Sequence, residues 1–146
     1  MNFKLGKRSI QKLSTVDERL QRIVRGAITV TEQDFSVICG IRTIQQQKAL
    51  VKKGASQTMK SKHIDGLAVD LMAYSLGGRW ELNLYDEIAD SMKASAKSEG
   101  YKIRWGAAWT IDDIGAWKGT THTYYSKTTQ AERNVEYSGS AEDAMN

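Results

Sequence analysis

Residues 61–70 read SKHIDGLAVD and bring His63, Gly66 and Asp70 into close succession. Histidine is otherwise rare, because His122 is the only other one in the chain. The stretch ends a polar segment and opens the apolar run LAVDLMAY, which is typical of a central strand. It therefore predicts a loop that passes directly into a buried strand.

With His63 at the end of the loop and Asp70 in the strand, a bend at Gly66 would let the two side chains converge on one point. Imidazole nitrogens and carboxylate oxygens are both ordinary zinc ligands, at distances of about 2.0 to 2.2 Å. A catalytic zinc site uses three protein ligands and one water. A site with two histidines would therefore have to include His122. A hydrogen-bonded pair without a metal is the structural alternative.

Apolar periodicity predicts helices and strands on both sides of this stretch. Thr15 and Glu18 form a capping box before an amphipathic helix, and Thr43 can cap a second helix that ends at Gly54. Helices are predicted over residues 16–28, 44–53 and 81–99, and strands over residues 34–40, 67–74 and 101–106. This order indicates an α+β fold, in which helices pack on a small antiparallel sheet.

The composition is that of one globular domain over residues 1–146. Hydrophobic residues make up 40% and charged residues 26%, with no apolar run typical of a membrane span or a secretory signal. Cys39 is the only cysteine, and its place in FSVICG predicts a buried small side chain. Residues 119–146 are rich in Thr, Ser and charge, which predicts a divergent or loosely held tail apart from a short strand near NVEYS.

The chain carries a net charge of +4 and has a pI near 9.2. This charge suits attraction to an anionic polymer, whether nucleic acid, a membrane surface or a cell wall. No block of five or more Lys or Arg residues occurs, so the sequence gives little support to nucleic-acid binding.

The string S-x-H-x-x-G-x-A-x-D, formed here by Ser61, His63, Gly66, Ala68 and Asp70, resembles the zinc motif of the M15 peptidases. That family includes D-Ala-D-Ala carboxypeptidases and the L-alanyl-D-glutamate endopeptidases that serve as endolysins of tailed phages. Three further stretches are similar to the family: FKLGKRSIQKLSTVDERLQ at the start, CGIRT at 39–43 and IRWGAAWT at 103–110. The resemblance spans roughly residues 3–118.

The resemblance implies the hedgehog/DD-peptidase-like zinc peptidase fold and metal-assisted amide hydrolysis. A zinc ion held by His63 and Asp70 would polarise the scissile carbonyl and make a bound water reactive at neutral pH. Arg42, in CGIRT, would stabilise the developing oxyanion or bind a carboxylate of the substrate. Ser61 and Trp109 are the expected substrate contacts.

The chain departs from the family in its last zinc ligand. Family members carry it near the C-terminus in a string such as P-H-F-E-L, with a catalytic Glu or Asp three residues earlier, and no such string occurs here. In one account, His122 is the third ligand and Asp113 or Asp112 is the general base. In the other, NVEY occupies the place of H-F-E-L, so that Asn134 replaces the histidine.

We therefore expect a zinc-dependent peptidoglycan peptidase of the phage endolysin type, which cleaves the L-Ala-D-Glu bond of the peptide stem. It would act as a monomer, without nucleic acid and without membrane insertion, first in the host cytoplasm and then at the cell wall. A D-Ala-D-Ala carboxypeptidase is the alternative within the family. An inactive wall-binding module is the alternative outside catalysis, because the Glu/Asp-x-x-His string is missing.

Overall fold

The computed structural model describes residues 3–56, 59–79, 81–105, 113–114 and 134–140. Within these residues the elements are, in chain order, α1 (Lys7–Leu13), α2 (Glu18–Val30), β1 (Phe35–Cys39), α3 (Ile44–Lys52), β2 (Ala68–Tyr74), β3 (Gly78–Arg79), α4 (Leu82–Glu99), β4 (Tyr101–Trp105) and β5 (Asn134–Ser140). The strands pair antiparallel in the order β1-β2-β5-β4, and β3 extends from β2. The predicted α+β fold with a small antiparallel sheet is confirmed.

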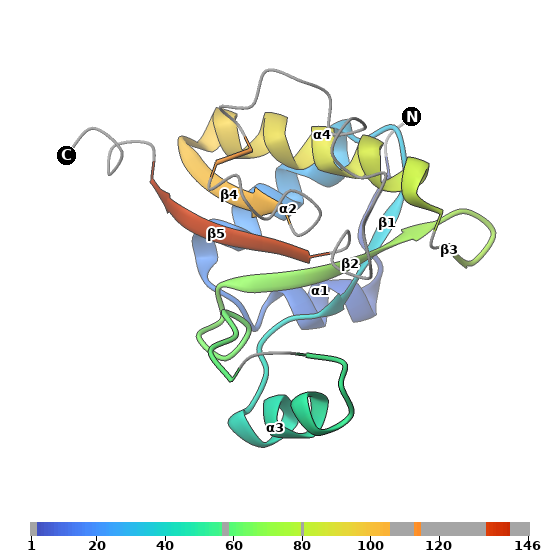
Figure 1. Cartoon of the computed structure of the whole chain (residues 1–146). Helices are drawn as coiled ribbons and strands as arrows, with labels where there is room; N and C mark the ends of the chain where they lie inside the picture. Colours follow the sequence, from blue (N-terminus) through green and yellow to red (C-terminus); the bar gives the residue numbers. More distant parts are fainter. Residues whose placement is uncertain (1–2, 57–58, 80, 106–112, 115–133, 141–146) are drawn as a thin grey trace.

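Helices α2 and α4 lie together on one face of the sheet (Figure 1). Each buries an apolar stripe at helical spacing, with Leu20, Ile23 and Val24 in α2 and Ile88 and Met92 in α4 fully buried. Gly100 adopts the left-handed conformation that ends α4, as its place in the sequence predicts. The amphipathic helix predicted after Thr15 is thus confirmed, and α4 buries a stripe of the same kind.

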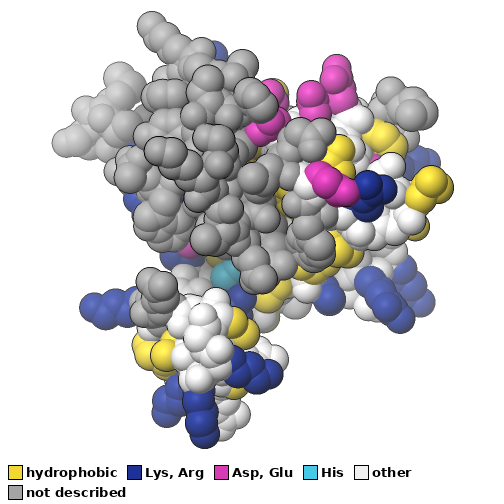
Figure 2. Space-filling model, turned by 45° about the vertical axis from the view of Figure 1, so that its right-hand side comes forward, with side chains coloured by type: hydrophobic (Ala, Val, Ile, Leu, Met, Phe, Trp, Pro, Cys, Tyr) yellow, Lys and Arg dark blue, Asp and Glu magenta, His cyan; other side chains and the backbone are white. Residues whose placement is uncertain are grey.

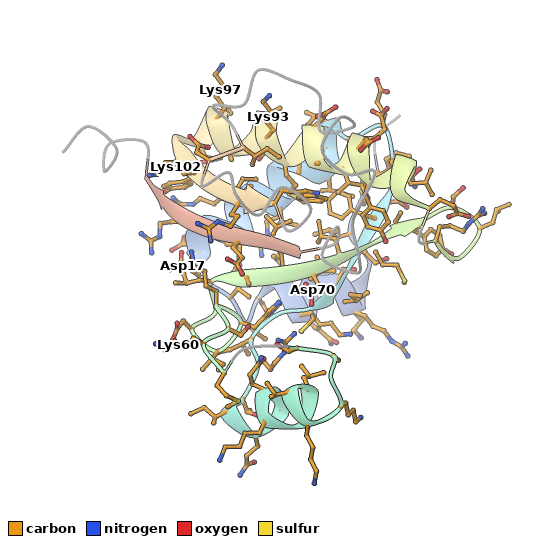
Figure 3. The ribbon with its side chains drawn as sticks, viewed as in Figure 1. Asp17, Lys60, Asp70, Lys93, Lys97 and Lys102 are labelled. Atoms are coloured by element: carbon orange, nitrogen blue, oxygen red, sulfur yellow. The ribbon has the colours of Figure 1, made fainter. Side chains whose placement is uncertain are left out.

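The pleat of β2 separates the core from the opposite face of the sheet. Val69, Leu71 and Ala73 belong to the buried core cluster, whereas Asp70 and Met72, which alternate with them, are only partly buried. Trp105 in β4 is also fully buried, so this tryptophan packs in the core. Asp70 therefore faces away from α2 and α4, on the side of the sheet nearest α3 (Figure 3).

Helix α1 lies along the edge strand β1 and occupies some of its unpaired backbone groups. Ser9 Oγ accepts a hydrogen bond from the backbone N–H of Val37 at 3.0 Å, and Lys12 Nζ donates to the carbonyl of Ile38 at 3.0 Å. These contacts protect an edge that could otherwise pair with another chain.

The predicted capping box at Thr15 is wrong, because α2 begins later. Asp17 is the N-cap residue, and its carboxylate accepts a hydrogen bond from the backbone N–H of Arg19 at 2.9 Å. The Thr15 hydroxyl instead donates to the carbonyl of Lys12 at 2.6 Å and accepts from the N–H of Ile41 at 2.9 Å. A tertiary contact with the segment after β1 thus takes the side chain that local sequence assigns to the helix. The second predicted cap, Thr43, is confirmed and forms a complete capping box with α3.

The segment 119–146 lies largely outside the described residues, but Asn134–Ser140 forms β5 between β2 and β4. The predicted strand near NVEYS is therefore confirmed. Among the described residues, no helix combines the length and the apolar character needed to cross a membrane.

Asp17 gives a test of how α2 begins. The hydrogen bonds from the Arg19 side chain hold the pKa of Asp17 below its usual value of 3.8. We expect Asp17→Ala to lower the free energy of unfolding by about 1 kcal/mol at pH 7, since it removes the cap. Asp17→Asn keeps an acceptor oxygen and should cost less.

The pH dependence separates charge from capping. Because the folded pKa is lowered, the stabilisation due to the carboxylate is present above pH 3.8 and is lost as the pH falls through the folded pKa. The difference between wild type and Asp17→Asn in urea unfolding should therefore shrink from pH 7 to pH 3. An Asp17→Ala protein as stable as wild type would contradict this assignment of the cap.

Candidate metal centre

The loop before β2 is shaped so that His63 lies beside Asp70. The backbone N–H of His63 donates to Ser61 Oγ at 3.2 Å, and the N–H of Gly66 donates back to the His63 carbonyl at 3.3 Å. Gly66 has a φ of 69°, which is unfavourable for residues with a Cβ. Its carbonyl accepts from the N–H of Asp17 at 2.8 Å, so the loop is tied to the start of α2. The predicted bend at Gly66 is confirmed.

His63 is 4% exposed and is held at both ring nitrogens. Nδ1 lies 2.8 Å from the carbonyl oxygen of Gly40, and Nε2 lies 3.4 Å from Oδ1 of Asp70. A carbonyl oxygen can only accept, so Nδ1 carries the hydrogen. In the neutral ring the free lone pair is therefore on Nε2, toward Asp70. This arrangement is the usual one for a metal-binding histidine, whose other N–H donates to a carbonyl or carboxylate.

The distance between the two donor atoms fits a metal better than a direct hydrogen bond. Charge-assisted N–H···O bonds are usually about 2.7 to 2.9 Å long, whereas His63 Nε2 and Asp70 Oδ1 are 3.4 Å apart. Two ligands in a tetrahedral zinc site, each about 2.0 to 2.1 Å from the ion, are about 3.3 Å apart. The nitrogen and oxygen present thus fit two adjacent ligand positions of such a site.

The charge state of the metal-free ring follows from its neighbours. Burial lowers the pKa of His63, but the hydrogen bonds and negative charge of Asp70, with contributions from Cys39 and the Gly40 carbonyl, outweigh it and raise the pKa to about 10. The metal-free ring is therefore protonated at neutral pH, and it must lose a proton before Nε2 can bind a metal ion.

Arg42 holds the second oxygen of the same carboxylate. Its Nη2 lies 3.6 Å from Asp70 Oδ2, and its Nη1 donates to Oε1 of Gln47 at 2.7 Å. Gln47 is fully buried and donates in turn to Ser56 Oγ at 2.8 Å. The backbone N–H of Arg42 also donates to the carbonyl of His63 at 2.9 Å. The guanidinium is thus fixed against Oδ2, and Oδ1 is left facing His63.

The surroundings of Gly40 explain why CGIRT contains a glycine. Its carbonyl orients His63, and a Cβ at this position would collide with the backbone carbonyl of Lys12 and the hydroxyl of Thr15. The end of β1 can therefore approach α1 closely only with glycine at position 40.

Cys39 lies in the site, which the sequence did not indicate, and the prediction that its side chain is buried is wrong. Its Sγ is 3.8 Å from His63 Nδ1 and 3.6 Å from Arg42 Nη2, and the side chain is only partly buried. Burial acts to raise the pKa of this thiol, but His63 and Arg42 outweigh it and the pKa is lowered. The ligand atoms of Cys39, His63 and Asp70 lie within 4.8 Å of one another. Cys39 approaches Nδ1, whereas Asp70 approaches Nε2, so His63 and Asp70 are the pair whose donor atoms could share a metal ion.

Glu136 is a second residue that sequence reasoning missed. It lies in β5 directly opposite Ala68 of β2, is 6% exposed, and faces the same side of the sheet as Asp70. Burial raises its pKa, although Lys62, Arg104 and His63 act in the other direction. The signal in the sequence was its place in NVEY, two residues after Asn134. Asn134 pairs with Asp70 across the two strands.

The remaining predicted site residues fall into two groups. Ser61 and Arg42 lie beside His63, as the motif implies, and Arg42 Nη1 is 3.5 Å from Ser61 Oγ. Asp113 is partly buried next to Ile114, which belongs to the core. The predicted ligand His122 and the predicted substrate contact Trp109 lie outside the described residues.

Comparison with known proteins identifies the family. The sequence model of the phage L-alanyl-D-glutamate peptidase family matches residues 1–125. The L-alanyl-D-glutamate peptidase of Escherichia phage T5 is 36% identical over 115 residues, which cover 75% of this chain and 83% of the phage protein. The crystal structure of the Serratia marcescens L-Ala D-Glu endopeptidase ChiX superposes with a TM-score of 0.72 at 29% identity, covering 92% of this chain and 90% of ChiX. The chain, with His63 in the loop before β2 and Asp70 within β2, belongs to the phage L-alanyl-D-glutamate peptidase family.

Proposed function

We propose that this protein hydrolyses the amide bond between L-alanine and D-glutamate in the peptide stem of bacterial peptidoglycan. The family match and the names of the T5 and Serratia relatives support this bond in preference to the D-Ala-D-Ala bond. The single observation that carries a hydrolytic role is the geometry of His63 and Asp70. As an endolysin, the protein would reach the wall from the host cytoplasm and act there as a monomer.

We propose zinc as the metal, with His63 Nε2 and Asp70 Oδ1 as two of its ligands. When bound, zinc supplies a Lewis acid that polarises the scissile carbonyl and lowers the pKa of a bound water. The Gly40 carbonyl keeps the His63 ring in the required tautomer and orientation. The third ligand that the sequence predicts, His122, belongs to the same proposal.

Arg42 has two proposed tasks. Its contact with Asp70 Oδ2 fixes the carboxylate, so that Oδ1 points to the metal position. The guanidinium also supplies positive charge next to the position where an oxyanion would develop, as the family resemblance implies. Ser61 Oγ, which accepts from the His63 backbone, supports the loop and is the proposed polar contact to substrate, together with Trp109.

Removal of either proposed ligand should abolish hydrolysis. We expect His63→Ala and Asp70→Asn to lower the rate of peptidoglycan lysis by about 100-fold or more, because neither variant can hold the metal. Chelation of wild-type protein should have the same effect, and added zinc should restore activity. The measurement is turbidity of a wall suspension, with mass spectrometry of the released peptides to identify the bond.

Asp65→Asn is the matched control, since Asp65 is an exposed acid in the same loop. It should keep wild-type activity. Wall binding without lysis by the zinc-loaded wild type would instead support the inactive wall-binding module. Release of D-alanine would support the carboxypeptidase.

Zinc binding should release a proton from the site. Since the metal-free His63 has a pKa of about 10, the ring is protonated below that pH, and binding at pH 7 should release about one proton from it. Apparent affinity should then rise as the pH rises from 6 to 8. Calorimetry in two buffers of different ionisation enthalpy measures this proton directly. A binding enthalpy that does not depend on the buffer would show that His63 is not a ligand.

Two carboxyl groups are proposed for proton transfer to or from the substrate. The sequence favours Asp113, and the structure adds Glu136, which is buried on the face of Asp70 and whose pKa is raised by that burial. If Asp113 transfers the proton, Asp113→Asn should lower kcat by about 100-fold, and if Glu136 does, Glu136→Gln should lower it by the same factor. The zinc content should be unchanged in both variants. Equal kcat in both variants and wild type would exclude both residues.

A further inference from the structure

The positive charge of this protein comes from one part of the chain. Residues 35–64 contain no acidic residue and six basic ones: Arg42, Lys48, Lys52, Lys53, Lys60 and Lys62. The whole chain has 21 basic and 17 acidic residues, so the rest has 15 against 17 and is slightly negative. Figure 2 shows this excess of positive charge on the lobe that contains α3. The lobe carries basic side chains (dark blue) and hydrophobic ones (yellow), and no acidic side chain (magenta) is visible on it. An anionic ligand would therefore be drawn to this lobe.

A groove of about 560 Å³ extends from this lobe to Asp70, one residue of the proposed metal pair. It runs between α1 and α3 at the end of β1, and Cys39, Arg42 and Asp70 form part of its wall. Its apolar lining includes Ile38 and Leu50. A volume of this size suits a short peptide segment or another small ligand.

Two exposed lysines line the groove from opposite sides. Lys12 comes from α1, and Lys53 is the residue that caps the C-terminus of α3. Asp70 is the only acid among the described residues that line it. That carboxylate already has Arg42 and His63 as partners, so the lysines are placed to meet an anion that comes from outside. Lys12 Nζ also donates to the Ile38 carbonyl, but an ammonium has three N–H donors and this bond uses one of them.

Arg42 is poorly placed to neutralise this anion alone. Its guanidinium already contacts Asp70, Gln47, Ser61 and Cys39, and its side chain is 13% exposed. A substrate carboxylate that lies in the groove farther from Asp70 therefore needs a different cation to balance its charge.

The proposed substrate supplies such a carboxylate. In an L-alanyl-D-glutamyl bond, the nitrogen of the scissile amide belongs to the glutamate. Only one of the two carboxyl groups of this glutamate forms the next amide of the peptide. The other stays free within a few bonds of the amide. A substrate with its scissile carbonyl at the metal pair thus places a negative charge within reach of the neighbouring groove.

We propose that the groove between α1 and α3 binds the glutamyl side of the stem peptide, with Lys53 and Lys12 as the positioning cations for its free carboxylate. This inference rests on the proposed function, because the metal pair must hold the scissile amide for the groove to receive that side. It assigns specificity for an acidic residue to two lysines that do not touch the metal ligands.

The test compares two soluble substrates: a stem peptide with the free glutamyl carboxylate, and the same peptide with this group converted to the carboxamide. We expect Lys53→Ala to raise KM for the acidic peptide about three- to fivefold, because an exposed ion pair contributes only a small free energy to binding. The value of kcat should stay within about twofold of wild type. KM for the carboxamide should not change, and Lys53→Arg should restore the acidic peptide. The effect should fade at high salt.

Lys97→Ala is the matched control. Lys97 is an exposed lysine of α4, on the far side of the sheet from Asp70 (Figure 3). Its loss should leave KM for both peptides unchanged. Lys12→Ala should act like Lys53→Ala, and the double variant should raise KM for the acidic peptide by about tenfold.

Three results would overturn the proposal. If Lys53→Ala raises KM equally for both peptides, the lysine does not bind the free carboxylate. An effect on wall suspensions with none on soluble peptides would mean that the lobe only attracts anionic wall polymers. If the wild type hydrolyses neither peptide, the proposed function fails. In that case, calorimetry measures the affinity of the protein for each peptide. Equal affinity for both would reject the proposal that the groove binds the free carboxylate.

Discussion

The hydrogen bond from His63 Nδ1 to the Gly40 carbonyl joins the two parts of the site. It connects the loop before β2 with the end of β1, and it decides which ring nitrogen faces Asp70. The bond is possible because β1 and β2 pair antiparallel with Cys39 opposite Asp70, so that the residue after β1 lies beside the loop that leads into β2. If the ring were turned, Nε2 would lose its place beside the carboxylate.

This constraint accounts for the glycines around the site. Position 40 needs a glycine because β1 ends against α1, where any Cβ would meet the Lys12 carbonyl. Position 66 needs one because its φ is 69°. Its carbonyl accepts a hydrogen bond from the start of α2. Both glycines thus serve the same purpose, which is to bring backbone from three elements close to one imidazole ring.

Electrostatics then divides the proposed site into a part with balanced charge and a part with excess positive charge. Asp70 is shared between His63 and Arg42, one for each carboxylate oxygen, so its charge is already balanced. The excess positive charge lies farther along the groove, on a lobe that contains no acid. In the proposed function, a site built this way would separate the groups that hold the ion from those that select an acidic substrate. This also explains why a basic chain can have a body that is slightly negative.

The sequence alone determined α2, α3, α4 and four of the five strands that the structure describes, though not α1 or β3, and it predicted His63 and Asp70 as a ligand pair. Helical spacing identified the buried face of α2, and the order of His63, Gly66 and Asp70 predicted the bend that brings the imidazole and the carboxylate together, because both signals are local. Only the tertiary structure decided what depends on packing between distant segments. Thr15 bonds to Ile41 in place of capping α2, Cys39 turns toward the imidazole, and one of three consecutive glutamines, Gln47, is buried to hold Arg42. Hydrogen bonds between residues far apart in the chain leave no periodic trace in the sequence, and the two lysines of the groove are likewise brought together only by the approach of α1 to α3.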